Sequence, residues 1–337
     1  MYNSSSKEVF NTLKNNGISV EKSPYCKFDS LESNEDLEAL FEVLTSFKDI
    51  NGSHPIITAN TVVANPDFEK IEESSYKKYF YEPFTETLKR YPNHNKVLNL
   101  YQEGIANNVF FPQFHGREHV NIELWLKLLK TDKNFKLAFK HNMWGLSNDV
   151  LHGLKSIQAT YDSTNINLMK DSISSGLSLF EDIFGYKSKT FIANNFIWDI
   201  KLEDVLFERG VECFQGMKYQ KLPKEDGRPR KMIRHHLGSV NKNNQLFSVR
   251  NSSFEPALND NGYENTLKDI ENAFFWKKPA IITSHRVNFK GSLSETNRKI
   301  NLANFKKLID VILTKWPEVE FMHSSELADL MNNQKYK

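Results

Sequence analysis

Short apolar runs alternate with amphipathic segments along most of the chain, and this alternation limits the possible folds more than any other feature. We predict strands at residues 54–60, 109–114, 189–193, 211–214, 279–284 and 319–322. Between them, apolar residues recur at helical spacing, for example at Leu37, Leu40 and Leu44. Ser33 and Asp36 precede these residues as a predicted capping box. Alternating strands and helices indicate an α/β fold in which helices cover a parallel sheet.

The predicted domain organisation is a single domain over residues 1–337. This length fits one α/β barrel, which typically has about 250 residues before insertions. Residues 217–250 break the alternation, because they are basic, rich in turn-forming residues and end in an alternating stretch. We interpret them as an inserted basic loop and hairpin.

Composition and missing motifs exclude several classes of protein. Lys and Arg number 44 against 42 Asp and Glu, a net charge of +2, so no nucleic-acid partner is expected. The predicted strands are not followed by a Gly-rich phosphate motif or a Gly-x-Ser-x-Gly elbow. The chain also contains no apolar run of about 18 residues, which a membrane-spanning helix requires. With only two cysteines and no signal-peptide pattern, we expect a cytoplasmic protein, and its oligomeric state is not predicted.

Polar clusters follow several of the predicted strands. They are Asn60, the pair His115 and His119, Asn194 with Asn195, and His285 with Arg286. In a closed βα barrel the C-terminal ends of all strands meet at one rim. We therefore expect these side chains to line one site.

His115 and His119 are four residues apart, directly after a predicted strand. On a helix or a tight turn this spacing brings both imidazoles to one side, where they can bind one divalent metal ion. The alternative is a chance spacing in which His115 only bonds to a loop. Arg117 and Glu118 lie between them, and the simpler interpretation of these two is an internal ion pair.

His285 and Arg286 end another predicted strand. A histidine there is suited to act as a general acid near neutral pH, and an arginine can hold a carboxylate or sulfate with two hydrogen bonds. The alternative for His285 is a buried histidine with satisfied hydrogen bonds. Asn60 and Asn195 either bond to sugar hydroxyls or cap helices, and the sequence leaves both alternatives open.

The segment His115-Gly116-Arg117-Glu118-His119 resembles the His-Ser/Thr-x-x-His motif of NodB-like polysaccharide deacetylases, although it lacks the Ser/Thr. Most of the chain resembles bacterial proteins labelled polysaccharide (de)acetylase that are encoded in capsule and surface-polysaccharide gene clusters. The segments that carry this resemblance are KSPYCKFDSLESNEDLEALFEVL, ITANTVVANPDF, YEPFTETLKRYPNH, FFPQFHGREHVN, SVRNSSFEP and SHRVNF.

The resemblance implies a distorted (β/α)7 barrel, a TIM-like fold, that acts on a carbohydrate substrate. It implies a divalent metal ion, zinc, held by one Asp and two His, which His115 and His119 match. A second Asp would be the base, and His285 matches the acid. We place Asn60, Arg117, Asn195, Glu255 and Arg286 in the expected substrate-binding set.

The acidic pair that the resemblance implies has no counterpart in the sequence. Thr58-Ala59-Asn60-Thr61 is the most similar segment and contains no acid. Relatives carry Asp-Asp-Trp-Gly just before the stretch that matches Ser5-Ser6-Lys7. We therefore expect a barrel without its first strand, its base and one metal ligand. Two imidazoles alone hold zinc weakly, and loss of a general base typically lowers the rate by ~10²–10⁴.

Three functions follow as hypotheses. The first is metal-dependent deacetylation of a polysaccharide or its precursor. The second is a catalytically impaired or truncated homologue that binds carbohydrate. The third is a glycosidase, for which Asp67 and Glu255 are the candidate carboxylates, at a separation of ~5 Å or ~6.5–9.5 Å.

Overall fold

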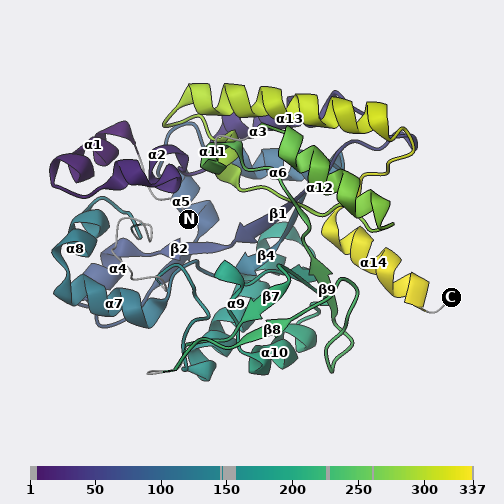
Figure 1. The fold of residues 1–337 in the computed structure, drawn as a ribbon. Coiled ribbons are helices and arrows are strands. Elements are labelled where there is room, and N and C mark those ends of the chain that lie inside the picture. Colours follow the sequence, from purple (N-terminus) through teal and green to yellow (C-terminus); the bar gives the residue numbers. More distant parts are fainter. Residues whose placement is uncertain (1–5, 145, 147–156, 225–227, 260–261, 336–337) are drawn as a thin grey trace.

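The computed structural model describes residues 6–144, 146, 157–224, 228–259 and 262–335. Its centre is a five-stranded parallel sheet in the order β1-β4-β5-β6-β9 (Figure 1). These strands are β1 (Ile57–Val62), β4 (Phe110–Gly116), β5 (Thr190–Phe191), β6 (Cys213–Gly216) and β9 (Leu246–Val249). These five strands lie across the sheet in the same order as along the chain, and every neighbouring pair is parallel. This confirms the predicted α/β fold with a parallel sheet.

Closure of the sheet into a barrel stays a prediction. In the described part of the chain, β1 and β9 are the edge strands of the five-stranded sheet. A further parallel pair, β10 (Ser252–Ser253) with β11 (Ile282–Thr283), follows β9 in the chain. Two antiparallel pairs complete the strands: β2 (Ala64–Pro66) with β3 (Tyr81–Pro83), and β7 (Tyr219–Lys221) with β8 (Met232–Arg234).

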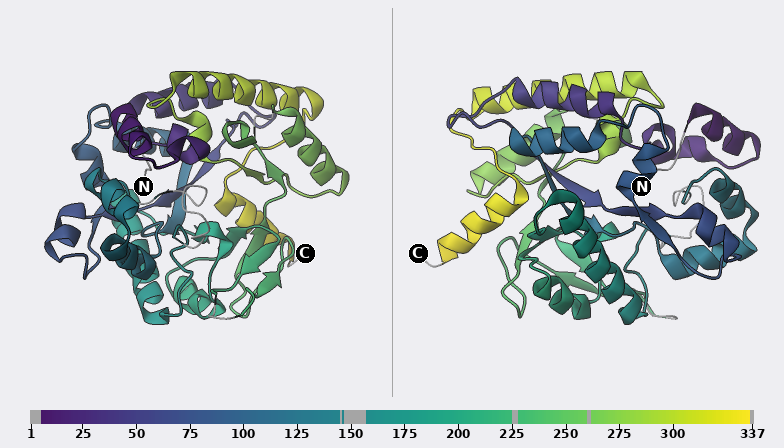
Figure 2. Two further views of the ribbon diagram at one scale, coloured as in Figure 1. Left: turned by 60° about the vertical axis from the view of Figure 1, so that its left-hand side comes forward. Right: turned by 180° about the vertical axis from the view of Figure 1, so that it is seen from behind.

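Helices lie on opposite sides of the sheet. In Figure 1, α3, α6, α12 and α13 lie above it and α9 and α10 below it. Figure 2 shows from behind that the N-terminal helices and α14 lie at opposite ends of the molecule. The helices are α1 (Lys7–Asn15), α2 (Pro24–Phe28), α3 (Asn34–Thr45), α4 (Phe68–Glu73), α5 (Phe84–Lys89), α6 (Val97–Ala106), α7 (Ile122–Thr131), α8 (Lys133–Lys140), α9 (Ile166–Phe184), α10 (Glu203–Glu208), α11 (Pro256–Asn259), α12 (Glu264–Phe275), α13 (Glu295–Lys315) and α14 (Ser324–Lys335). Among the described residues, no helix is long and apolar enough to cross a membrane.

Side chains hold β4 and β5 together where the backbone cannot. Pro112 lacks the N–H that a regular ladder uses, and only Phe114 and Phe191 are paired between these strands. The buried Gln113 amide oxygen instead accepts hydrogen bonds from the Thr190 backbone N–H at 2.8 Å and from the Ser188 hydroxyl at 3.0 Å. The strand that leads to His115 is thereby fixed to its neighbour.

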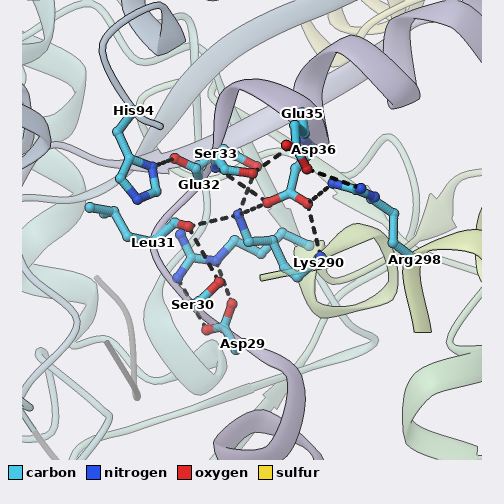
Figure 3. Close-up of polar contacts among 12 residues, drawn as sticks. Asp29, Ser30, Leu31, Glu32, Ser33, Glu35, Asp36, His94, Lys290 and Arg298 are labelled. Carbon is cyan, nitrogen blue, oxygen red and sulfur yellow. Dashed lines mark hydrogen bonds and ion pairs between the residues drawn. The ribbon is translucent and has the colours of Figure 1, made fainter. Parts of the chain in front are cut away.

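A buried ionic cluster joins α3 to the segment that precedes α13 (Figure 3). The Lys290 side chain is fully buried, and its Nζ lies 2.7 Å from Asp36 Oδ2 and 3.0 Å from the carbonyl oxygen of Leu31. Arg298 Nη1 lies 2.9 Å from Asp36 Oδ1. Burial opposes ionisation of Asp36, but the charge and hydrogen bond of Lys290 outweigh it and lower the Asp36 pKa to about 2. Distant parts of the chain are thus held together by charge.

Two predicted elements differ from the structure. Residues 246–249 are strand β9 of the main sheet, whereas the prediction placed them in the inserted hairpin, which consists of β7 and β8. Residues 319–322 are in none of the described strands. Partners far away in the chain decide both, because a strand needs a neighbour.

Candidate functional site

A cavity of about 1250 Å³ lies along the strands and reaches their C-terminal ends. Residues at or after the ends of β4, β5, β6, β9 and β11 line it: His115, His119, Asn195, Gln215, Arg250 and His285. Parallel strands present their C-terminal ends at one edge of a sheet, which is where ligands bind in α/β proteins. The expectation that His115, His119 and His285 line a common site agrees with this geometry.

His115 is held by the neighbouring strand segment. Its Nδ1 lies 2.8 Å from the carbonyl oxygen of Ile192, so Nδ1 carries the proton and Nε2 is the acceptor atom. The Asn194 amide nitrogen lies 3.4 Å from Nε2 and 3.1 Å from the carbonyl oxygen of His115. Burial lowers the His115 pKa well below its usual value, and repulsion from His119, Arg250 and His285 adds to this effect. The ring is therefore neutral at neutral pH.

His119 faces His115 across a tight turn. The two ring centroids are 5.1 Å apart, with the planes at 71°. Burial lowers the pKa of His119 to about 4, and repulsion from His285 acts in the same direction. Two neutral imidazoles therefore line the cavity together, as the spacing of four predicted.

Gly116 makes the turn between the two histidines possible. Its φ is +122°, and a Cβ atom here would lie 3.0 Å from both the Tyr161 hydroxyl oxygen and the Glu118 carbonyl oxygen. A side chain at this position would be strained by its backbone angle and crowded by these two oxygens.

The histidine pair does not by itself form a zinc site. Within residues 6–144, 146, 157–224, 228–259 and 262–335, no three His, Cys, Asp or Glu residues form a cluster that could hold a metal ion. A catalytic zinc normally has three protein ligands and a structural one four. Two imidazoles are too few, so the described residues do not fit a resident zinc ion, and zinc remains a prediction.

Glu255 orients His285 at the other side of the cavity. Its Oε1 lies 2.6 Å from Nδ1 of His285, and its Oε2 accepts from Asn288 Nδ2 at 2.9 Å. The His285 side chain is 51% exposed, whereas that of Glu255 is 8% exposed. A carboxylate that binds one ring nitrogen leaves the other free to transfer a proton. Glu255 was predicted to bind substrate, but its carboxylate contacts His285 instead.

Two arginines predicted to bind substrate are held in internal ion pairs. Arg286 Nε and Nη2 lie 2.8 Å and 3.1 Å from the carboxylate oxygens of Asp29. Arg117 Nε lies 2.6 Å from Glu118, its Nη1 bonds to Ser175 at 2.8 Å, and its side chain is not part of the cavity lining. The placement of Arg117 in the substrate-binding set is therefore corrected, because its guanidinium is buried among protein groups.

Asn60 and Asn195 both line the cavity. The Asn60 amide oxygen accepts from Gln215 Nε2 at 3.0 Å, so part of its side chain is used within the protein. Asn195 has a left-handed φ of 54° in the short 3₁₀ helix Asn194–Phe196. Neither caps a described helix, and both remain candidates for contact with a ligand.

The carboxylate pair of the glycosidase hypothesis is not assembled. Asp67 caps α4 and forms an ion pair with Lys70 at 2.8 Å, and it does not line the cavity. Glu255 is the partner of His285. These two carboxylates therefore do not share a site.

Sequence reasoning missed several residues of the cavity wall, among them Tyr25, Trp144, Gln215 and Arg250. Arg250 directly follows β9, so a correct assignment of residues 246–249 as a core strand would have revealed it. No signal in the sequence marks Tyr25 or Trp144, which come from segments outside the strand ends.

Comparison with known proteins gives little further information. No family model matches the chain, and no curated protein matches it. A solved structure that matches is the 4-alpha-glucanotransferase from Thermococcus litoralis, with a TM-score of 0.44 and 13% identity. The match covers 97% of this chain, which spans only 38% of that enzyme's chain. Similarity at this level is not informative about function.

Proposed function

We propose that the protein binds a carbohydrate in this cavity, as a homologue of NodB-like polysaccharide deacetylases whose described residues do not complete the metal site. The observation that carries the proposal is the convergence of His115, His119 and His285 on one cavity from distant parts of the chain. The three histidines were also assigned from the resemblance to the deacetylase family, and that assignment does not depend on the cavity.

The lining of the cavity suits a sugar. Apolar and aromatic side chains such as Tyr25, Trp144 and Phe196 lie near polar groups with hydrogen-bonding atoms, including Asn195 and Gln215. Sites for small ligands combine such walls with a few polar groups that fix orientation. Sugars present apolar ring faces together with hydroxyl groups, and this mixture matches both kinds of surface.

The second candidate is deacetylation, and two features favour it. His115 is fixed through Nδ1, which is how metal-binding histidines are usually oriented. Glu255 holds His285 in the arrangement of a proton-transfer pair. Deacetylation through a metal ion would need at least one further ligand from outside the described residues.

One experiment separates the two candidates. Partially acetylated oligosaccharides are titrated into the protein by calorimetry, with and without zinc, and acetate release is measured in parallel. Binding without acetate release supports the carbohydrate-binding proposal. Zinc-dependent acetate release that is lost in His115→Ala, but kept in the exposed-loop control His236→Ala, supports deacetylation. If neither binding nor acetate release is detected, both candidates are wrong.

A further inference from the structure

Arg250 differs from the other arginines around the site. It directly follows β9, its backbone N–H bonds to the Gly216 carbonyl oxygen at 2.8 Å, and its side chain lines the cavity. Arg117, Arg286 and Arg298 are each paired with a carboxylate. In the described part of the chain, no ion pair or side-chain hydrogen bond involves the Arg250 guanidinium.

The carboxylate that attracts Arg250 is already bonded to other groups. Glu255 attracts Arg250 electrostatically, but its two oxygens bond to the ring and backbone of His285 and to Asn288. Two other carboxylates that line the cavity also have cationic partners, since Asp29 pairs with Arg286 and Asp36 with Lys290. Arg250 therefore brings to the cavity wall a charge that no ion pair among the described residues compensates.

A guanidinium has five N–H donors, and a charge withdrawn from water is unfavourable unless it is paired. Burial lowers the pKa of Arg250 to about 10, so it still carries its charge at neutral pH. Arg250 thus brings one positive charge with unused donors to the cavity wall.

We propose that Arg250 binds a singly charged anionic group of the ligand, and that the carbohydrate in this cavity is an acidic sugar. A guanidinium binds a carboxylate or a sulfate ester through two parallel N–H···O bonds. The single cation fits a monoanion better than a doubly charged phosphate. This inference extends the proposed function by naming the substrate class and rests on that function for the sugar.

The test compares matched ligands with and without the charge. Glucuronic acid is compared with glucose, and glucose 6-sulfate provides the sulfate arm, with binding to the full chain measured by calorimetry. The variants are Arg250→Gln, Arg250→Lys and the control Arg234→Gln, which changes an exposed arginine on β8.

The protein should bind at least one acidic sugar roughly tenfold to hundredfold more tightly than glucose, which is the usual strength of charged hydrogen bonds. Arg250→Gln should lose this preference without weaker glucose binding, Arg250→Lys should keep part of it, and Arg234→Gln all of it. The sugar that is preferred identifies the group as carboxylate or sulfate.

Each failure has a distinct meaning. Equal binding of acidic and neutral sugars by the unchanged protein overturns the role of Arg250 and leaves carbohydrate binding intact. A preference that survives in Arg250→Gln overturns it as well. If none of the sugars binds, but acetate or methyl sulfate binds and this binding is lost in Arg250→Gln, the anion site stands and the carbohydrate function fails.

Discussion

At the level of single residues, pairing decides which arginine is available to a ligand. Arg286 was expected to contact substrate, but Asp29, 257 residues away in the chain, holds it through two hydrogen bonds. Arg250 was not singled out by sequence reasoning, yet it lines the cavity with its guanidinium donors unused among the described residues. Both side chains follow strands, so their position in the sequence does not distinguish them.

A substitution of Gly116 tests the turn between the two histidines. Gly116→Ala should lower the free energy of unfolding by about 1–3 kcal/mol and disturb the turn between His115 and His119, because φ is +122° and the new Cβ would be crowded by two oxygens at 3.0 Å. The control is Gly238→Ala, which has a φ of +79° but nothing within 4 Å of the added atom. Urea unfolding of both variants measures the difference, and an equal loss in both would contradict a special role for Gly116.

Among the elements, α3 illustrates how a locally encoded helix becomes fixed in the fold. Its capping box between Ser33 and Asp36 was predicted and is present. The same Asp36 carboxylate also binds Lys290 and Arg298, which lie more than 250 residues further along the chain. One side chain therefore begins the helix and anchors it.

Asp36 gives a prediction about pH. Because its pKa is lowered from 3.8 to about 2, its contribution to stability is present above pH 4 and is lost as the pH falls towards 2, a change of about 2 kcal/mol. At pH 7, Asp36→Asn should lower the free energy of unfolding by about 3 kcal/mol, since Lys290 stays buried without its carboxylate.

Denaturant titrations at pH 7, 4 and 2 measure both effects. The difference in free energy of unfolding between the original protein and Asp36→Asn should become smaller as the pH falls. Glu35→Gln is the control, because Glu35 is a 69% exposed partner of Arg298 and should contribute less than about 1 kcal/mol. If this difference in free energy stays constant down to pH 2, the charge of Asp36 is not what stabilises the fold.

The strands differ in how well their backbones are protected. Strand β4 has partners on both sides, whereas β1 has β4 on one side and no described strand on the other. In hydrogen–deuterium exchange, amides of residues 57–62 should exchange faster than those of residues 110–116, because edge hydrogen bonds open more easily. Equal protection of the two strands would mean that another segment or a second copy covers the edge of β1.

At the scale of the whole molecule, residues from both ends of the chain share one hydrophobic core. One hydrophobic core contains residues of α3, α6 and β4 together with residues of α13, including Leu302, Leu308 and Ile312. Figure 1 shows α13 extended along the top of the same layer. The N-terminal and C-terminal thirds of the chain therefore bury their apolar surfaces against each other.

This arrangement predicts the outcome of a truncation. A fragment of residues 1–284 should not unfold cooperatively and should be degraded quickly in limited proteolysis, because it lacks Lys290 and the apolar face of α13. The full chain is the control, and circular dichroism melting provides the second measurement. A protease-resistant fragment with a sharp melting transition would show instead that the chain contains a separate domain.

The sequence alone predicted features that depend on neighbouring residues. The capping box of α3, the existence of β1, β4, β5 and β6, and the proximity of His115 to His119 are examples. These features follow from spacing within a few positions, where one residue directly restricts the conformation of the next. The parallel sheet also followed, because alternating strands and helices leave few other arrangements.

Only the tertiary structure decided which side chains are available at the site and which are used internally. Arg117 and Glu255 were expected to contact substrate. Instead, Arg117 forms an ion pair with its neighbour in the chain, and Glu255 binds a histidine ring. Residues 246–249 became a core strand because β6 lies beside them, and residues 319–322 have no such described neighbour. Strand pairing and ion pairing depend on partners that only the fold brings close together. The local sequence does not specify which residues these partners are.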